Sequence, residues 1–336
     1  MKKSLLAIFM TGAAVSAWAQ TNVSIYGVAD VGLHRVNNGT TSVLSLDSGI
    51  LNGSRIGFRG TEDLGGGLSA SFQLENGFSV DNGTLRQGGR LWGRQSWVGL
   101  NGSFGSVRLG RQDNPIHRAL DAIDPFGTGL SGNIENIFNG YDSRSDNMVT
   151  YLTPTVGGFS GQLAYGLGEV PGSASTGRLL GGLAGYKQGP INVQLAHHNQ
   201  HTTAAGADTG SEKSTMVGGV YDFKVAKAHV AYAKNRGDRL GANTTDSRDT
   251  MLGVTVPAGP GTILGSYVRK DSRLGLRPTT SLLALGYTYS LSKRTTLYTS
   301  YGRYNNDSAG TLGPDGSTIA AGANATSIDV GLQHRF

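Results

Sequence analysis

The strongest constraint on this 336-residue chain is a period-two alternation of apolar with small or polar residues, which recurs along most of its length. In the segment 159–168, FSGQLAYGLG, the large apolar residues fall at odd positions and the small or polar residues at even positions. The segment 279–290, TTSLLALGYTYS, shows almost the same pattern. Successive side chains of a strand point to opposite faces, so each segment predicts a strand with one apolar face. Helical periodicity is nearly absent, which indicates an all-β fold.

About sixteen such segments can be counted, and residues typical of turns separate them. The alternation is least regular in 91–101 and 179–187. The strands are expected near 22–35, 53–61, 68–78, 91–101, 105–112, 144–152, 159–169, 179–187, 191–200, 213–223, 227–236, 248–256, 262–270, 279–290, 295–304 and 324–336.

The connections between these segments are alternately short and long. Short ones, such as TEDLGGGL and NGSFG, are followed by longer and more polar ones. This alternation is typical of an up-and-down sheet whose two ends face different environments, as in outer-membrane barrels with short periplasmic turns and long external loops. The longer connections are 36–52, 79–90, 113–143, 170–178, 201–212, 237–247, 271–278 and 305–323.

The face opposite the apolar one is rich in Gly, Ser, Thr, Gln and Asn, with scattered Arg and Glu. A water-soluble sandwich would carry many charges there, whereas a barrel in lipid turns its apolar face outward and a polar face inward. Closure of the sheet pairs every strand and leaves no edge, which accounts for stability in an exported chain with no cysteine. We therefore predict a transmembrane β-barrel.

The first residues, MKKSLLAIFMTGAAVSAWAQ, have the pattern of a secretory signal peptide. Lys2 and Lys3 precede a short apolar stretch, and Ala17-Trp18-Ala19 forms a small-x-small cleavage site. The stretch is too short for a stable membrane span, and the pattern favours a cleaved leader over a buried N-terminal helix. We expect residues 1–19 to be removed and residues 20–336 to form a single barrel domain in the outer membrane.

The chain ends on another alternating segment, SIDVGLQHRF, whose last residue is Phe336. To close a barrel this strand must pair with the first one, near 21–33. The alternate apolar residues of this strand would then face lipid, and Phe336 would lie at the inner interface of the membrane. There it would act as a barrel-closing signal for the assembly machinery. The alternative is an ordinary final edge strand.

Several classes of function are not indicated. The net charge is +6, without a basic block interleaved with aromatics, so no nucleic-acid partner is predicted. No metal or cofactor site is predicted either: His197 and His198 are adjacent and would point to opposite faces of a strand. Gly65-Gly66-Gly67 lacks the Lys-Ser/Thr of a phosphate loop. No Ser-His-Asp arrangement stands out, so no enzyme activity is expected.

Five stretches resemble the trimeric general diffusion porins of Gram-negative bacteria, most closely the β-proteobacterial and neisserial branch. The resemblance implies a sixteen-stranded antiparallel barrel, a homotrimer in the outer membrane, and a third external loop that folds into the pore as a constriction. It covers essentially the whole chain after the leader. The stretches are SIYGVADVGL, SRIGFRGTEDLGGGL, GSVRLGRQDNP, LGYTYSLSKRTTLY and VGLQHRF.

The segment 113–143 is the longest connection and lies between the fifth and sixth expected strands. Connections of this length are usually functional or disordered, and its Ile, Leu and Phe content argues against disorder. The resemblance places it inside the barrel with 124–129 at its tip; a lid over the external mouth is the alternative. Asp121, Asp124 and Glu135 would present negative charge to the lumen.

Basic residues are expected on the wall opposite this loop. Arg55 and Arg59 share the polar parity of the second strand, and Arg144 has that of the sixth. The resemblance matches Arg55, Arg94 and Arg144 to the constriction arginines of anion-selective members. Glu75, on the polar face of the third strand, either adds acid to the constriction or pairs with an arginine to hold the wall. The two roles are compatible.

Together these features predict a passive channel for ions and small hydrophilic solutes, weakly anion-preferring at neutral pH. One rival is a solute-specific channel, which for a sugar requires a file of aromatics along the lumen. Tyr298 and Tyr304 have lumenal parity, but two residues do not make a file. A barrel enzyme or adhesin is the other rival.

Overall fold

The computed structural model describes residues 22–139 and 141–336, so the predicted leader lies outside the described residues. In the described part, no helix is both long and apolar enough to cross a membrane. The elements are β1 (Asn22–Asn37), β2 (Ser42–Ser48), β3 (Arg55–Gly65), β4 (Leu68–Gly77), β5 (Gln95–Gly102), β6 (Gly105–Asp113), α1 (Pro115–Asp121), η1 (Ile134–Asn136), β7 (Arg144–Leu152), β8 (Phe159–Gly166), β9 (Leu179–Gln188), β10 (Ile191–Ala204), β11 (Ala207–Asp222), β12 (Lys227–Arg239), β13 (Ala242–Ala258), β14 (Gly261–Ser272), β15 (Thr279–Ser290), β16 (Thr295–Asn306), η2 (Pro314–Gly316) and β17 (Ala325–Arg335).

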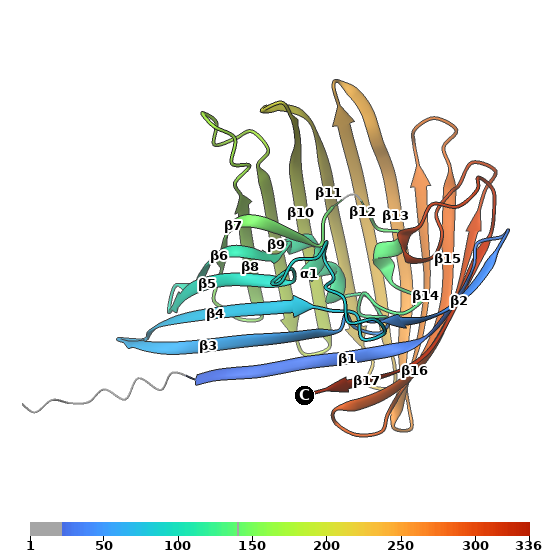
Figure 1. The fold of residues 1–336 in the computed structure, drawn as a ribbon, viewed down its shortest axis with the longest axis horizontal. Coiled ribbons are helices and arrows are strands. Elements are labelled where there is room, and N and C mark those ends of the chain that lie inside the picture. The colour runs from blue at the N-terminus through green and yellow to red at the C-terminus, as the bar shows by residue number, and fades with distance from the viewer. Residues whose placement is uncertain (1–21, 140) are drawn as a thin grey trace, which may run out of the picture.

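The strands form one closed antiparallel sheet (Figure 1). Closure comes from β17, which pairs with β1 as the terminal alternation predicted. Two backbone hydrogen bonds between Gly27 and Phe336, of 2.9 and 3.1 Å, extend this pairing, the seam of the barrel, to the last residue. β3 pairs with the first part of β1 and β2 pairs with the rest of it. These two strands therefore follow one another along β1 and count as one strand of the barrel wall. The barrel therefore has sixteen strand positions, which confirms the predicted sixteen-stranded antiparallel barrel.

The alternation places apolar side chains on the outside of the wall. In β15, Leu283 and Leu285 are 56% and 61% exposed, whereas their neighbours Leu282 and Ala284 are almost completely buried. Because every strand bonds to two neighbours, the backbone polar groups are satisfied within the sheet while the apolar face points outward. This is the arrangement that a lipid environment requires.

The inner face is not polar throughout. Along β10–β17 it carries small or apolar residues that form a buried cluster with the segment 116–138. The predicted polar residues are present on this part of the wall too, for example Gln194, Asn235 and Asp249, but this apolar cluster lies among them. The wall side of the cluster consists of Ala196, Met216, Ala231, Ala233, Met251, Leu264, Val268, Leu282, Ala284, Tyr298, Tyr304 and Ala325.

Two of the expected long loops are hairpins instead. The connections 201–212 and 237–247 continue the ladders of β10–β11 and β12–β13 to two-residue turns at 205–206 and 240–241 (Figure 1). Both turn residues have positive φ in each case, as in the type I′ turns that suit hairpins. These extensions are polar on both faces, so they lack the apolar alternation by which the strands were predicted. Similarly, 36–52 contains β2.

Candidate functional site

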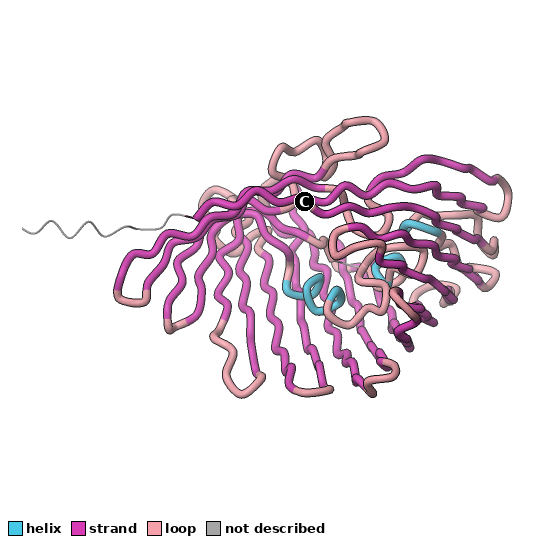
Figure 2. The backbone as a smooth tube through the Cα atoms, turned by 90° about the horizontal axis from the view of Figure 1, so that it is seen from below, coloured by secondary structure: helices cyan, strands magenta, loops and turns pink. Residues whose placement is uncertain are grey.

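The segment 113–143 begins with the short helix α1 on the concave side of the sheet (Figure 2). Pro115 stands in its first turn, where a missing backbone N–H costs little. Ile116, Ala119 and Leu120 recur at helical spacing and are at most 1% exposed. The helix contacts β9, β10 and β11, so its apolar stripe is buried against the wall rather than in water.

Two wall glycines allow this segment to approach closely. A Cβ at Gly218 of β11 would overlap the Cδ1 atom of Ile123, and a Cβ at Gly286 of β15 would lie 2.9 Å from Phe126. Both contacts are too close for a real side chain, so a larger residue at either position would displace the segment. Part of the high glycine content therefore serves the packing of 113–143.

Polar contacts attach the far part of the segment to the last strands of the barrel. Ser131 Oγ donates to Asp329 Oδ2 at 2.7 Å, and Asn136 Nδ2 donates to the hydroxyl of Tyr304 at 2.9 Å. Since Ser131, Asp329 and Asn136 are almost fully buried, these hydrogen bonds hold the segment at defined points. Further attachments run from Leu130 N to Ile50 O (2.6 Å) and from Lys270 Nζ to Ile137 O (3.1 Å).

The two tyrosines with lumenal parity are both engaged in this framework. Tyr304 accepts the amide of Asn136, and the hydroxyl of Tyr298 donates to Asp30 Oδ1 at 2.8 Å. Both side chains are at most 3% exposed. They fasten the wall and its segment, so they offer no aromatic surface to a passing sugar.

Basic residues gather on the other part of the wall, over β3–β7. Arg94 lies just before β5, and its Nε is 2.7 Å from Glu75 Oε1. Arg144 begins β7, and its Nε is 2.8 Å from Asp113 Oδ1. Glu75 thus pairs with an arginine, which is the expected role in which it holds the wall. The carboxylates limit the positive charge of these two arginines without removing it.

A cavity of about 420 Å³ separates this basic wall from α1. Arg55 enters it from β3, and its Nη2 donates a long hydrogen bond to Asn52 Oδ1 at 3.4 Å. Asp121 enters it from the end of α1. The structure therefore brings together Arg55, Arg94, Glu75 and Asp121 among the predicted residues, with Arg144 paired to a residue of the lining. The lining is Arg55, Gln73, Glu75, Arg94, Gln95, Arg108, Gln112, Asp113, His117, Arg118 and Asp121.

Sequence reasoning missed two arginines of this cavity. Arg108 of β6 stacks over Trp97, with Cζ 4.2 Å from the ring centroid, and Arg118 comes from α1. Arg108 alternates with the apolar Val107 and Leu109, so the sequence pattern could have predicted that its side chain lies on the inner face. Arg118 offered no such signal because α1 was not predicted. Within residues 22–139 and 141–336, no carboxylate lies within ion-pair distance of Arg55, Arg108 or Arg118.

Arg59 lies apart from this group. It is exposed, with Cζ 5.2 Å from the ring centroid of Tyr26, and it lines a neighbouring cavity of about 500 Å³. The two cavities share Gln73 and Arg108. Arg59 has the predicted parity, but it is four residues along β3 from Arg55 and thus about 13 Å away along the strand.

The expectation that Asp124 presents charge to the lumen is wrong. Its carboxylate is 6% exposed and accepts the backbone N–H groups of Phe126, Thr128 and Ile134. Burial raises the pKa of this carboxyl to about 7, although the three donors oppose the shift. Asp124 therefore organises the turn at the tip of the segment.

Glu135 is also occupied within the segment. Its Oε1 is 2.7 Å from Nδ1 of His117 and accepts the hydroxyl of Tyr141 at 2.9 Å. Burial alone would raise the pKa of the Glu135 carboxyl, but the contact with His117 holds it below its ordinary value. The same contact raises the pKa of His117 against the effect of burial. The prediction of a free acid at Glu135 is therefore also corrected: it forms an internal ion pair.

Phe336 packs its ring over Gly27 at the seam between β17 and β1, and is 49% exposed. Among the described residues, no group of three or more His, Cys, Asp or Glu side chains is arranged to hold a metal ion. His197 bonds Thr215 at 2.7 Å on the exposed face, while His198 is buried on the inner face. The two rings thus diverge as predicted.

Known proteins share this architecture. A family model described as Gram-negative porin matches residues 4–309. Over the full length of both chains, this chain is 34% identical to an outer membrane porin of Bordetella pertussis and 33% identical to outer membrane porin protein 32 of Delftia acidovorans. The solved structure of the anion-selective porin from Comamonas acidovorans superposes with a TM-score of 0.86 and 31% identity, over 94% of this chain and 100% of that chain. The likeness therefore runs along nearly the whole chain.

Proposed function

Because this chain belongs to the Gram-negative porin family, we propose that the cavity between the arginine wall and α1 is the narrow part of its diffusion pore and favours anions. The protein is a porin of the outer membrane, a passive channel and not an enzyme. What remains to be assigned is where its pore narrows and which ions it prefers.

The constriction is assigned to the segment 113–143. Its hydrogen bonds and apolar contacts hold it against β9–β17, which leaves the gap on the side of β3–β6. A solute that passes the barrel at this level must then pass between α1 and the arginines. This supports the inward-folded loop as part of a single barrel domain, 20–336.

The observation that carries the anion preference is the positive charge of Arg55, Arg108 and Arg118 around one cavity, none of which has a carboxylate partner among the residues that the structure describes. Asp121 is the one lining carboxylate, among the described residues, that pairs with no basic side chain. Unit charges 4 Å apart interact by about 1 kcal/mol in water and about 4 kcal/mol at an effective dielectric of 20. The excess of arginine thus favours chloride without excluding potassium. The anion-selective Comamonas relative supports the same assignment.

The test is reconstitution into a planar bilayer and measurement of the zero-current potential across a KCl gradient. The wild-type potential should indicate chloride preference. The double variant Arg55→Gln/Arg118→Gln should move it toward potassium by more than half of its wild-type value. Arg35→Gln, an exposed arginine on the outer face of β1, is the matched control and should leave it unchanged. A potassium preference in the wild type, or an equal shift in the control, would refute the proposal.

We further propose that the functional unit is a homotrimer, that residues 1–19 are a cleaved leader, and that the assembly machinery reads the last strand through Phe336. Membership of the porin family supports the trimer and the leader. The backbone hydrogen bonds between Phe336 and Gly27, where the last strand meets the first, support the role of Phe336. An unboiled sample should migrate on a gel near three times the mass of one chain, and deletion of Phe336 should reduce the amount of this species in outer membranes. A monomeric band from native membranes would contradict the trimer.

A further inference from the structure

Between β2 and β3 the chain leaves the wall of the barrel for the residues 49–54. The ladder of β2 with β1 ends at Ser48, and the ladder of β3 with β1 begins at Arg55. On β1, only Ala29 and Asp30 lie between these two ladders. We call the segment 49–54 the β2–β3 bend. Because it belongs to neither ladder, its backbone N–H groups need acceptors from elsewhere.

Asp30 supplies these acceptors. Its side chain is completely buried, and Oδ1 accepts the N–H groups of Ile50 at 3.0 Å and Leu51 at 3.4 Å. Oδ2 accepts the N–H of Asn52 at 3.0 Å, and the backbone carbonyl of Asp30 accepts that of Gly49 at 2.9 Å. One residue of β1 thus holds four successive N–H groups of the bend.

The wall side of the same carboxylate is also occupied by donors. The hydroxyl of Tyr298 donates to Oδ1, and Gln333 Nε2 donates to Oδ2 at 3.1 Å. All five groups that contact the carboxylate of Asp30 are therefore donors. An asparagine amide would turn its NH2 group toward some of them in either orientation, so it cannot replace the carboxylate.

The bend in turn contacts the packed segment 113–143. Ile50 O accepts the N–H of Leu130 at 2.6 Å, and a Cβ on Gly129 would overlap the carbonyl oxygen of Leu51. The side chains of Ile50 and Leu51 also pack against the buried cluster. The bend therefore lies on the inner side of the wall and sets how far 113–143 extends at this point.

On its other side the bend contacts the arginines of the cavity. Asn52 Oδ1 accepts the long hydrogen bond from Arg55 Nη2, and a Cβ on Gly53 would lie 2.8 Å from Nη1 of Arg94. The bend is thus in contact with the packed segment and with the arginine wall at once. A displacement of the bend would alter both sides of the cavity.

We propose that Asp30 is a positioning residue for ion selectivity. It fixes the β2–β3 bend, and the bend sets the place of Arg55 relative to the segment 113–143. Asp30 is completely buried, so it acts through Asn52 and Ile50 and not by contact with a solute. This inference rests on the proposed function of the cavity, and it adds a residue outside the lining to the groups that determine selectivity.

The experiment compares Asp30→Asn with wild type in two measurements on the full-length protein. In hydrogen exchange, peptides that cover 49–54 and 126–134 should exchange about tenfold faster. This corresponds to about 1.4 kcal/mol, within the range for a buried group that loses its partner. The zero-current potential should move toward potassium as far as in Arg55→Gln. Loss of a negative charge by itself would move this potential toward chloride, so the direction separates positioning from charge.

A double variant tests the route of the effect. Asp30→Asn/Arg55→Gln should shift the potential no further than Arg55→Gln alone, because both changes act through the same guanidinium. Asn52→Ala removes the contact with Arg55 and leaves the backbone bonds of Asp30 in place. It should move the potential toward potassium without faster exchange, and it keeps the test valid if Asp30→Asn does not assemble.

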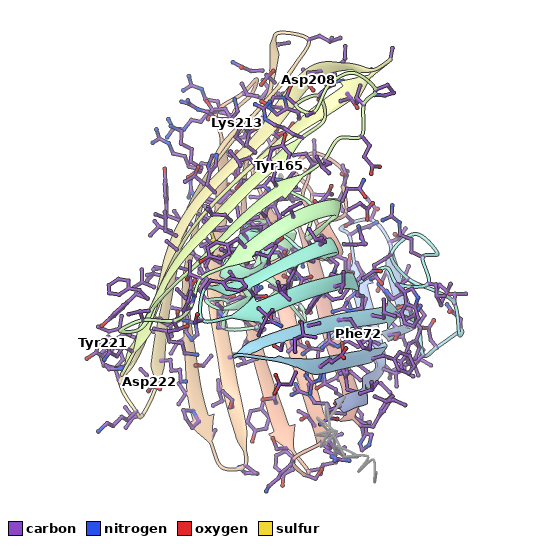
Figure 3. All side chains as sticks on the ribbon, turned by 90° about the vertical axis from the view of Figure 1, so that its left-hand side faces the viewer. Phe72, Tyr165, Asp208, Lys213, Tyr221 and Asp222 are labelled. Carbon is purple, nitrogen blue, oxygen red and sulfur yellow. The ribbon has the colours of Figure 1, made fainter. Side chains whose placement is uncertain are left out.

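Two controls address charge and stability. Asp222→Asn removes the same charge by the same substitution at the short-turn end of β11 (Figure 3) and should change neither measurement. Tyr298→Phe removes one donor from the wall side of Asp30 and leaves the three side-chain bonds to the bend. It should lower the Tm without altering the potential, as expected of a contact that only stabilises the fold.

Three outcomes would overturn the proposal. Unchanged exchange in Asp30→Asn would show that the bend does not depend on this carboxylate. A shift toward chloride would reduce Asp30 to its charge. Additive shifts in Asp30→Asn/Arg55→Gln would show that Asp30 does not act through Arg55. If Arg55→Gln alone leaves the potential unchanged, the assignment of the pore fails instead, and the exchange data still decide whether Asp30 holds the bend.

Discussion

The two sides of the inner wall differ in what their inward positions carry. Along β3–β6 these positions hold long charged side chains such as Arg55, Glu75 and Arg108, and a cavity remains in front of them. Along β10–β17 many of them are small or apolar, such as Ala196 and Ala284, and the segment 113–143 covers these, while the charged Lys270 and Asp249 pair with each other at 2.9 Å. The same strand alternation builds both sides, so the inward residues decide which side is packed and which stays open.

The physical reason lies in desolvation. Ala196 and Ala284 lose nothing when another apolar segment covers them, and the wall then buries Ile116, Leu120 and Phe126. Covering arginines would require a partner for every charge. The packed side therefore holds the segment, and a cavity remains on the charged side, where we propose the narrow part of the pore.

The largest effect is expected from breaking the packed side. Phe126→Ala removes a ring that is 3% exposed and contacts the wall near Gly286. A buried Phe→Ala change costs about 3–5 kcal/mol, and here the loss falls on the attachment of the segment rather than on the strand ladders. Single-channel conductance should rise and segment 113–143 should become sensitive to protease. Leu285→Ala, on the outer face, is the control, and unchanged conductance in Phe126→Ala would separate the segment from the constriction.

The next largest effect is expected from the ion pair between Arg94 and Glu75 on the charged side. Arg94→Gln leaves Glu75 without its partner at 2.7 Å and should move the zero-current potential strongly toward potassium. Glu75→Gln frees Arg94 and should move it toward chloride. Opposite shifts in the two variants are expected because each removes one sign of charge from the same pair. Shifts of the same sign would indicate that the pair only holds the wall.

A pH effect is expected at the tip of the packed segment. The pKa of Asp124 is raised to about 7, so folding of the tip favours the protonated carboxyl. The stabilisation is complete below the ordinary Asp pKa near 4 and is lost as the pH rises through about 7. Backbone amides of 126–134 should therefore exchange hydrogen more slowly at pH 5 than at pH 8, after correction for intrinsic rates. In Asp124→Asn this difference should disappear; its persistence would exclude Asp124 as the cause.

The smallest effect is expected from Asp121→Asn. Asp121 lines the cavity from α1 and accepts the hydroxyl of Thr128 at 3.2 Å. Removal of this single charge should increase chloride preference slightly, by less than the shift of Arg55→Gln/Arg118→Gln in the other direction. The zero-current potential is the readout. A shift toward potassium would show that Asp121 does not oppose the entry of anions into the pore.

The pattern of the sequence predicted most of the barrel but only part of the site. Strand parity predicted that Arg55 and Glu75 share the inner face, and it also contained the signal for Arg108. It did not predict Arg118, because a seven-residue helix within a connection has too few turns to show a period. The expectation that Asp124 and Glu135 present charge to the lumen was wrong, because their partners lie within the same segment. Strand alternation gives no information on such contacts.

The pattern of the sequence was sufficient to predict the closed antiparallel sheet, the outward apolar face and the pairing of the last strand with the first. The strands and their apolar face follow from local alternation, and the last pairing follows because closure of the sheet leaves the first and last strands only each other as partners. The contacts of the folded chain place 113–143 along β9–β17 and pair Glu75 with Arg94, and within the described residues they leave three arginines around α1 without a carboxylate partner. Those features depend on contacts between residues far apart in the chain, such as Ser131 with Asp329, whose distance no local pattern encodes.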